Sequence, residues 1–223
     1  MKTFFESKQR GELYHFTDIF GLIGMLSSGL MYAGFQRDWE VDRGYYFSLT
    51  RNHLLFNSTG STKTASMFAI ANIVLDGDAI SENIKIVPFQ SRKNKNIHKA
   101  EFEERVYSSK NTLPLDRYCK YVVVDLSRFT LDNLLFRGSS LSIRDKFPLD
   151  EVHCIYNFYL YLCSRFDVEP STNLSGFLLS YKEPLTEEEF TTILKFIIKS
   201  FNKTKLPILF TNFPKYRKNG NLF

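Results

Sequence analysis

Short apolar segments with strand character recur through the first 126 residues of this chain and stop near Ser127. The clearest runs from Tyr118 to Leu126 and has three consecutive valines at its centre. The others are 12–16, 45–50, 69–75 and 85–89. After Ser127 the long apolar stretches have helical spacing instead. This division predicts an α+β fold, with a strand-rich first part and a mainly helical second part packed on it.

One early helix is well marked, from about Ile19 to Ser28. Its apolar residues follow the i, i+3, i+4, i+7 spacing of a helix face. They are Ile19, Leu22, Ile23 and Leu26. Thr17 or Asp18 precedes the helix as an N-cap, and Gly29 stands where a C-cap glycine is expected. The sequence therefore predicts a strand that leads directly into a capped helix.

The second part contains two further helix signals. Residues 149–166 are long, aromatic and compatible with a helix, and Thr186 is followed by three glutamates that suit the positive end of a helix dipole. We expect residues 1–126 to form the core and 127–223 to form a helical extension, together one compact domain. A chain of 223 residues with 43% hydrophobic content is long enough for such a domain.

Composition excludes several classes of protein. The three cysteines show no C-x-x-C pattern and no zinc-ligand spacing, which predicts a cytoplasmic protein without a metal site. No run of about 18 apolar residues is present, so we expect no membrane partner. Neither a dinucleotide-binding glycine pattern nor a P-loop occurs. The net charge of +5 is compatible with a nucleic acid partner.

Three polar islands interrupt the apolar segments. They are Tyr14-His15-Phe16-Thr17, Phe47-Ser48-Leu49-Thr50-Arg51 and Ala100-Glu101-Phe102-Glu103-Glu104-Arg105-Val106-Tyr107. Strand alternation puts Glu101 and Glu103 on one face and Glu104 on the other. The glutamates form either a solvated patch that offsets the basic run before them or part of a site. Ser48 and Thr50 likewise share a face of their strand.

Taken together, the islands resemble the ADP-ribosyltransferase superfamily, in particular the DarT-like enzymes and related bacterial and phage transferases, toxins among them. The resemblance covers roughly residues 12 to 126 and includes Val74-Leu75-Asp76-Gly77-Asp78 and Lys85-Ile86-Val87-Pro88 between the second and third islands. It implies a split β-sandwich with helices, in which NAD lies in the cleft between the two sheets.

The resemblance also implies roles for individual residues. Those that would contact NAD, the substrate, are His15, Phe16, Thr17, Tyr46, Ser48 and Arg51. Of these, His15 and Thr17 would hold the adenosine ribose end. Tyr46 and Ser48 would line the nicotinamide side, and Arg51 would face the pyrophosphate or the reacting ribose.

Glu103 would be the catalytic glutamate, with Glu101 completing an E-x-E pair and Arg51 beside them. Cleavage of the nicotinamide–ribose bond develops oxocarbenium character, which a carboxylate stabilises most in the transition state. A second carboxylate, Glu101 or Glu104, would accept the proton of the incoming nucleophile. A one-residue register slip would exchange Glu103 and Glu104.

The acceptor stays open at this point. The spacing of Glu101 and Glu103 is associated with transferases that modify protein arginine. His15 and the excess of basic over acidic residues look more like the transferases that modify nucleic acids. The basic run from Arg92 to Lys99 favours DNA or RNA, because it would contact phosphates beside the cleft. The helical extension would shape that groove or bind an antitoxin or another regulatory protein. The alternative is a non-catalytic binding module with the same fold.

Overall fold

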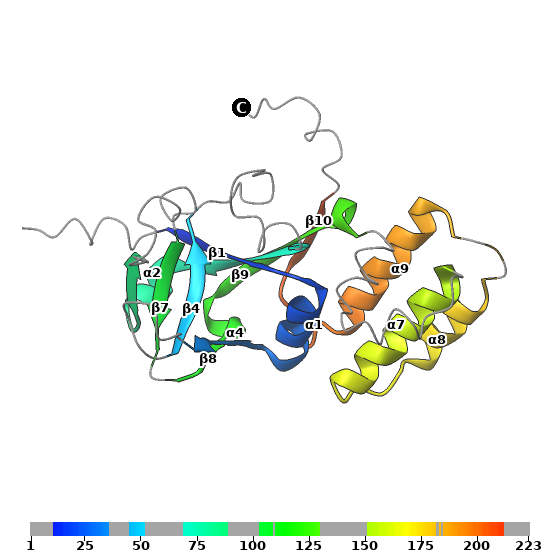
Figure 1. Ribbon diagram of the computed structural model, residues 1–223, viewed down its shortest axis with the longest axis horizontal. Coiled ribbons are helices and arrows are strands. Elements are labelled where there is room, and N and C mark those ends of the chain that lie inside the picture. Colours follow the sequence, from blue (N-terminus) through cyan, green and yellow to red (C-terminus); the bar gives the residue numbers. More distant parts are fainter. Residues whose placement is uncertain are drawn as a thin grey trace, which may run out of the picture.

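The computed structural model describes residues 11–35, 45–51, 69–88, 103–108, 110–129, 151–181, 183 and 185–211. They form a mixed α+β fold in which a mostly antiparallel open sheet lies on one side of helix α1 and a group of helices on the other (Figure 1). The predicted α+β class is confirmed. Among the described helices, none has the length and apolar character needed to cross a membrane.

The main sheet has the strand order β10-β9-β5-β1-β4-β7-β6, with the short β3 paired to β4. Its strands are β1 (Glu12–Thr17), β3 (Gly34–Phe35), β4 (Tyr45–Thr50), β5 (Ala71–Asp76), β6 (Lys85–Pro88), β7 (Glu103–Tyr107), β9 (Cys119–Asp125) and β10 (Ile208–Thr211). A second, two-stranded sheet pairs β2 (Leu30–Tyr32) with β8 (Thr112–Pro114).

The main sheet has a seam between β1 and β4. β1 pairs with β5 along all six of its residues, whereas among the described residues its register with β4 shows one pair, Tyr14 and Thr50. On the far side of the seam, β4 pairs with β7 over five residues. Two well-paired halves, β10-β9-β5-β1 and β4-β7-β6, therefore meet through one narrow junction.

The side chains of the main sheet alternate between its two faces, which differ in character. One face is mostly aliphatic and buried, and it joins the core cluster of the molecule. Its members include Leu13, Phe47, Leu49, Ile73, Leu75, Ile86, Val106, Val122 and Val124. The helices α1 (Ile19–Ser28), α2 (Gly77–Ser81) and α4 (Leu115–Tyr118) contribute buried residues to the same core. The opposite face carries aromatic and polar residues, among them Tyr14, Tyr46, Ser48, Thr50 and Arg105.

Helix α1 begins and ends where the sequence predicts. The Asp18 side chain caps its first turn by accepting a hydrogen bond from the Gly21 backbone N–H at 2.8 Å. Gly29 ends it with a φ of 71°, a left-handed conformation that favours glycine, and donates its N–H to the Met25 carbonyl at 2.8 Å. The strand β1 thus leads into a helix whose start is fixed.

The second part of the chain contains α7 (Glu151–Arg165), α8 (Thr172–Leu179) and α9 (Glu187–Ser200), which lie beyond α1 as seen from the sheet (Figure 1). Thr186 and Glu189 form the capping box that the sequence indicates. Two elements of this part were not predicted: the helix α8, and the strand β10, which returns to the sheet and pairs in parallel with β9. The helical part therefore ends in a strand.

Candidate functional site

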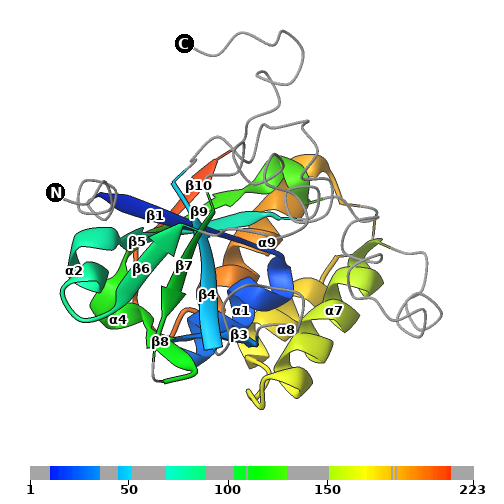
Figure 2. The ribbon, with the colours of Figure 1, turned by 60° about the vertical axis from the view of Figure 1, so that its left-hand side comes forward.

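The three strands that carry the polar islands are neighbours in the sheet. β1, β4 and β7 are adjacent in the strand order, and Figure 2 shows β4 and β7 side by side, with β1 crossing near one end of β4. Tyr14 of β1 lies opposite Thr50 of β4, and Thr50 lies opposite Glu103 of β7. One row across the sheet thus joins segments that are 36 and 53 positions apart in the sequence. The structure brings the first two islands and the described part of the third together.

The β4–β7 register separates the two adjacent glutamates. Glu103 lies opposite Thr50, on the face that also carries Ser48 and Arg105. Glu104 lies opposite Leu49, which is 2% exposed and belongs to the core. Glu103 therefore occupies a position on the polar face and Glu104 a position on the aliphatic face. Glu101 lies outside the described residues, so its predicted role stays a prediction.

His15 bridges the seam. Its Nδ1 atom is 3.1 Å from the backbone carbonyl oxygen of Ser48. Because a carbonyl can only accept, Nδ1 carries the proton in this contact, and the neutral ring keeps its lone pair on Nε2. Burial lowers the pKa of His15, against the opposing effects of the Ser48 carbonyl and the Asp18 carboxylate. The imidazole is therefore neutral at pH 7 and presents a hydrogen-bond acceptor at Nε2.

His15 does not share a strand face with Glu103. It lies opposite Ile73 in the β1–β5 register, one position away from Tyr14, which belongs to the row of Glu103. Its ring reaches the other half of the sheet through the Ser48 backbone, at the point where the β1–β4 register has ended. The arrangement puts His15 at the seam and Glu103 on the polar face beside it.

Thr17 ends β1 directly before the cap of α1. A Cβ added to Gly21 would overlap the Thr17 hydroxyl oxygen, so the absence of a side chain at Gly21 lets that hydroxyl lie against the first turn of the helix. The Thr17 carbonyl accepts a hydrogen bond from the Ile70 N–H at 2.9 Å, which holds the end of β1 to β5. Phe16, the preceding residue, is half-buried opposite Asn72.

Arg105 is the site residue that the sequence interpretation missed. Its side chain is 5% exposed, and its guanidinium carbon lies 3.7 Å from the centroid of the Tyr46 ring. This contact fixes a cation next to Ser48, its register partner on β4. The signal available in the sequence was strand alternation, which puts Arg105 on the same face as Glu103. Arg51 follows β4 directly and is half-buried, and Tyr46 is half-buried under the guanidinium.

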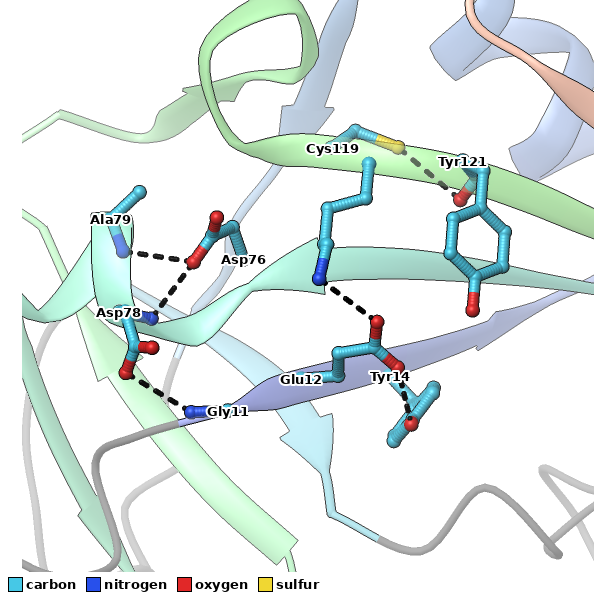
Figure 3. A network of polar contacts seen from close by, with 9 residues as sticks. Gly11, Glu12, Tyr14, Asp76, Asp78, Ala79, Cys119 and Tyr121 are labelled. Carbon is cyan, nitrogen blue, oxygen red and sulfur yellow. Dashed lines mark hydrogen bonds and ion pairs between the residues drawn. The ribbon is translucent and has the colours of Figure 1, made fainter.

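A second group of polar side chains lies at the start of β1 (Figure 3). Glu12 accepts hydrogen bonds from the Tyr14 hydroxyl at 2.8 Å and from Lys120 Nζ at 3.0 Å, and both contacts lower its pKa. Burial and the Glu12 carboxylate raise the pKa of Tyr14 to about 12. Asp76 accepts hydrogen bonds from the Asp78 and Ala79 backbone N–H groups at the start of α2, and Asp78 accepts one from the Gly11 N–H just before β1. These three carboxylates have structural partners.

Comparison of the chain with protein-family models, with curated proteins and with solved structures found no match. Within the part of the chain that the structure describes, no group of three or more His, Cys, Asp or Glu residues is placed to hold a metal ion. The described residues bring to the seam a neutral imidazole, hydroxyls, two arginines and the backbone position of Glu103.

Proposed function

We propose that this protein is an NAD-dependent ADP-ribosyltransferase with the split β-sandwich of that superfamily, which transfers ADP-ribose to a macromolecule and releases nicotinamide. The observation that carries the proposal is the strand order β1-β4-β7, which gathers His15, Ser48 and Glu103 around one seam. In the superfamily that the sequence resembles, NAD lies in the cleft between two sheets, and we assign that place to the seam between β1 and β4.

The side chains at the seam suit the binding of a dinucleotide. Nε2 of the neutral His15 is an acceptor for a ribose hydroxyl. The Thr17 hydroxyl, which lies against Gly21 in the first turn of α1, offers a second polar group. Arg105 and Arg51 supply positive charge for the pyrophosphate. The Tyr46 ring, already stacked under a guanidinium, offers an aromatic wall for nicotinamide.

Glu103 is the proposed catalytic residue. When the bond between nicotinamide and ribose breaks, its electron pair leaves with nicotinamide and positive charge grows on the sugar. A carboxylate at the polar-face position of Glu103 stabilises that charge, and Glu101 is proposed to take the proton of the attacking acceptor group.

A nucleic acid is the preferred acceptor. The chain carries a net charge of +5, and electrostatic attraction to phosphates would hold a strand beside the site. A base modified in this way must be single-stranded or flipped out of a duplex. Transfer to protein arginine is the alternative chemistry, and a non-catalytic module that binds nucleic acid or protein is the alternative class.

The test uses NAD labelled in its ADP-ribose part, with nicotinamide release measured in parallel. We expect Glu103→Gln to lower transfer by about 100- to 1,000-fold, the size typical for loss of one electrostatic stabiliser. Glu104→Gln is the matched control, because it changes the neighbouring glutamate, whose backbone position belongs to the aliphatic face, and its fold is checked by thermal unfolding. Label that becomes nuclease-sensitive identifies a nucleic acid acceptor, and protease-sensitive label identifies a protein.

Two outcomes would overturn the proposal. Full transfer activity in Glu103→Gln would remove the residue assignment. Absence of nicotinamide release by the wild-type protein with single-stranded DNA, RNA and arginine-rich protein alike would favour the non-catalytic module.

A further inference from the structure

The C-terminal half of α7 lies against the first turn of α1. Phe20, the second residue of α1, makes edge-to-face contacts with Phe158 and Tyr161 of α7, with ring centroids 6.0 Å apart in both pairs. Phe20 follows Thr17 by three residues, so its Cα lies at most about 11 Å from that of Thr17. The helical part of the chain therefore contacts the first turn of the helix that directly follows β1, and the end of β1 belongs to the proposed NAD site.

Arg165 is held at this junction. Its guanidinium carbon lies 5.6 Å from the Phe20 ring centroid and 6.0 Å from that of Phe166, and its Nη1 donates a hydrogen bond to the Tyr161 hydroxyl at 3.1 Å. The side chain is exposed. It forms no ion pair with any described carboxylate, although Asp167 and Glu169 are near it in the sequence.

This geometry favours an anionic ligand. Two rings and a hydroxyl limit the motion of the guanidinium, so less conformational entropy is lost when it binds. Because the Tyr161 oxygen accepts from Arg165, its own O–H is left to donate to the same ligand. A planar cation and a neighbouring hydroxyl donor together match the oxygens of a phosphate.

We propose that Arg165 and Tyr161 form a phosphate-binding subsite at the edge of the proposed NAD site. The phosphate belongs either to NAD or to the nucleic acid acceptor. This proposal rests on the proposed function, because NAD and the nucleic acid acceptor are the substrates of that function. It gives α7 a direct part in substrate binding.

A purely structural role for Arg165 would be to complement the dipole at the C-terminal end of α7. Lys199 offers the matched comparison. It also lies in the last turn of a helix, α9, and its Nζ is 5.8 Å from the centroid of the Phe210 ring. Loss of charge at Lys199 therefore also removes a cation from the last turn of a helix, but one that lies over Phe210 of β10 rather than over Phe20 of α1.

The experiment measures Kd for three probes: NAD, inorganic pyrophosphate and a labelled single-stranded oligothymidylate. It compares the wild-type protein with Arg165→Gln, Tyr161→Phe and Lys199→Gln. We expect Arg165→Gln to weaken binding of the probe that uses the subsite roughly tenfold, and Tyr161→Phe to weaken it about threefold. Lys199→Gln should leave the same Kd within about twofold.

The pattern of losses identifies the source of the phosphate. If the phosphate belongs to the nucleic acid, Arg165→Gln also reduces the slope of log K against log salt by about 0.7, the contribution of one phosphate on a single strand. If it belongs to NAD, binding of NAD and pyrophosphate weakens and the salt slope for the oligonucleotide is unchanged.

Equal effects of Arg165→Gln and Lys199→Gln on all three probes would overturn the subsite. So would unchanged Kd values for Arg165→Gln together with an unchanged melting temperature. Failure of the proposed function has a different signature, because the wild-type protein would then neither bind NAD nor release nicotinamide, while the pyrophosphate and oligonucleotide measurements still decide the subsite.

Discussion

The two nitrogen atoms of His15 have separate tasks, and two substitutions separate them. In His15→Asn the side-chain amide occupies the place of Nδ1 and can still donate to the Ser48 carbonyl, which accepts from Nδ1 at 3.1 Å in the wild-type protein. In His15→Gln the amide reaches the place of Nε2 and can accept a hydrogen bond there, but it leaves the Ser48 contact unmade.

The expected magnitudes follow from one hydrogen bond in each case. A neutral hydrogen bond contributes about 1 kcal/mol net, and this corresponds to roughly fivefold in an equilibrium constant. His15→Gln should therefore lower the free energy of unfolding by about 1 kcal/mol and keep most of the affinity for NAD. His15→Asn should keep the stability and bind NAD roughly fivefold more weakly.

The assays are urea unfolding for stability and calorimetric titration with NAD for affinity. Urea unfolding is repeated between pH 7.5 and 5. Because the folded pKa of His15 lies below its usual value of 6.5, the unfolded chain binds the proton more readily. The neutral His15 ring therefore contributes to the free energy of unfolding above about pH 6.5, and this contribution is lost as the pH falls toward the folded pKa. His15→Asn removes that dependence.

Three results would refute the reasoning. The first is a parallel loss of stability and affinity in both variants, which would mean that the two ring nitrogens are not separable. The second is a His15 pKa above 6.5 in an NMR titration of the folded protein, because the ring would then be partly charged at neutral pH. The third is a His15→Asn protein with unchanged affinity for NAD.

Further predictions concern the start of β1 and its surroundings. Glu12→Gln should lower the pKa of Tyr14 from about 12 but leave it above 10, because the burial of Tyr14 remains. An ultraviolet titration of tyrosinate checks this prediction, and an unchanged pKa would contradict the hydrogen bond between Tyr14 and Glu12. Burial raises the pKa of Cys119 to about 12 from a usual 9.0, so its thiolate fraction at pH 8 should be about a thousandfold lower than that of an ordinary thiol. The rate of Cys119 alkylation, followed by peptide mapping, tests this prediction, and a rate as fast as that of an ordinary thiol would contradict it. In Gly77→Ala the new Cβ would overlap the Gly11 carbonyl oxygen, so we expect a loss of about 1–3 kcal/mol in urea unfolding, with wild-type stability as the contrary result.

Local signals in the sequence were sufficient for elements whose ends are fixed by their own residues. Helix α1 has its cap at Asp18 and its left-handed glycine at Gly29, and α9 has its capping box at Thr186. Each of these devices acts within one turn of the helix, so the sequence itself shows where the helix begins or ends.

Elements that depend on distant pairing could not be predicted in the same way. The short strand β10 has no strong pattern of its own and exists through its pairing with β9. The small sheet of β2 and β8 is of the same kind, since Leu30 and Pro114 meet only in the folded chain. Helix α8 is short and has a weak apolar face, so it was also missed.

The candidate site shows the same division. Sequence alternation correctly placed Arg105 and Val106 on opposite faces of their strand. It could not decide whether Glu103 or Glu104 belongs to the polar face, because that depends on which residue of β4 stands opposite. The pairing of Glu104 with Leu49 supplies this information. The partnership of Arg105 with Tyr46 also needs two strands to be placed before it is visible.

The parallel pairing of β10 with β9 has a consequence for synthesis on the ribosome. Thr211 donates a hydrogen bond to the Val124 carbonyl, 87 positions earlier in the chain. At about 5–20 residues per second, roughly 4–17 s pass between translation of the two strands. During that interval the outer edge of β9 has unpaired backbone groups that can recruit a strand from another nascent chain. Slower translation of the helical part should therefore increase aggregation of this protein, and chaperones that cover strand edges should reduce it.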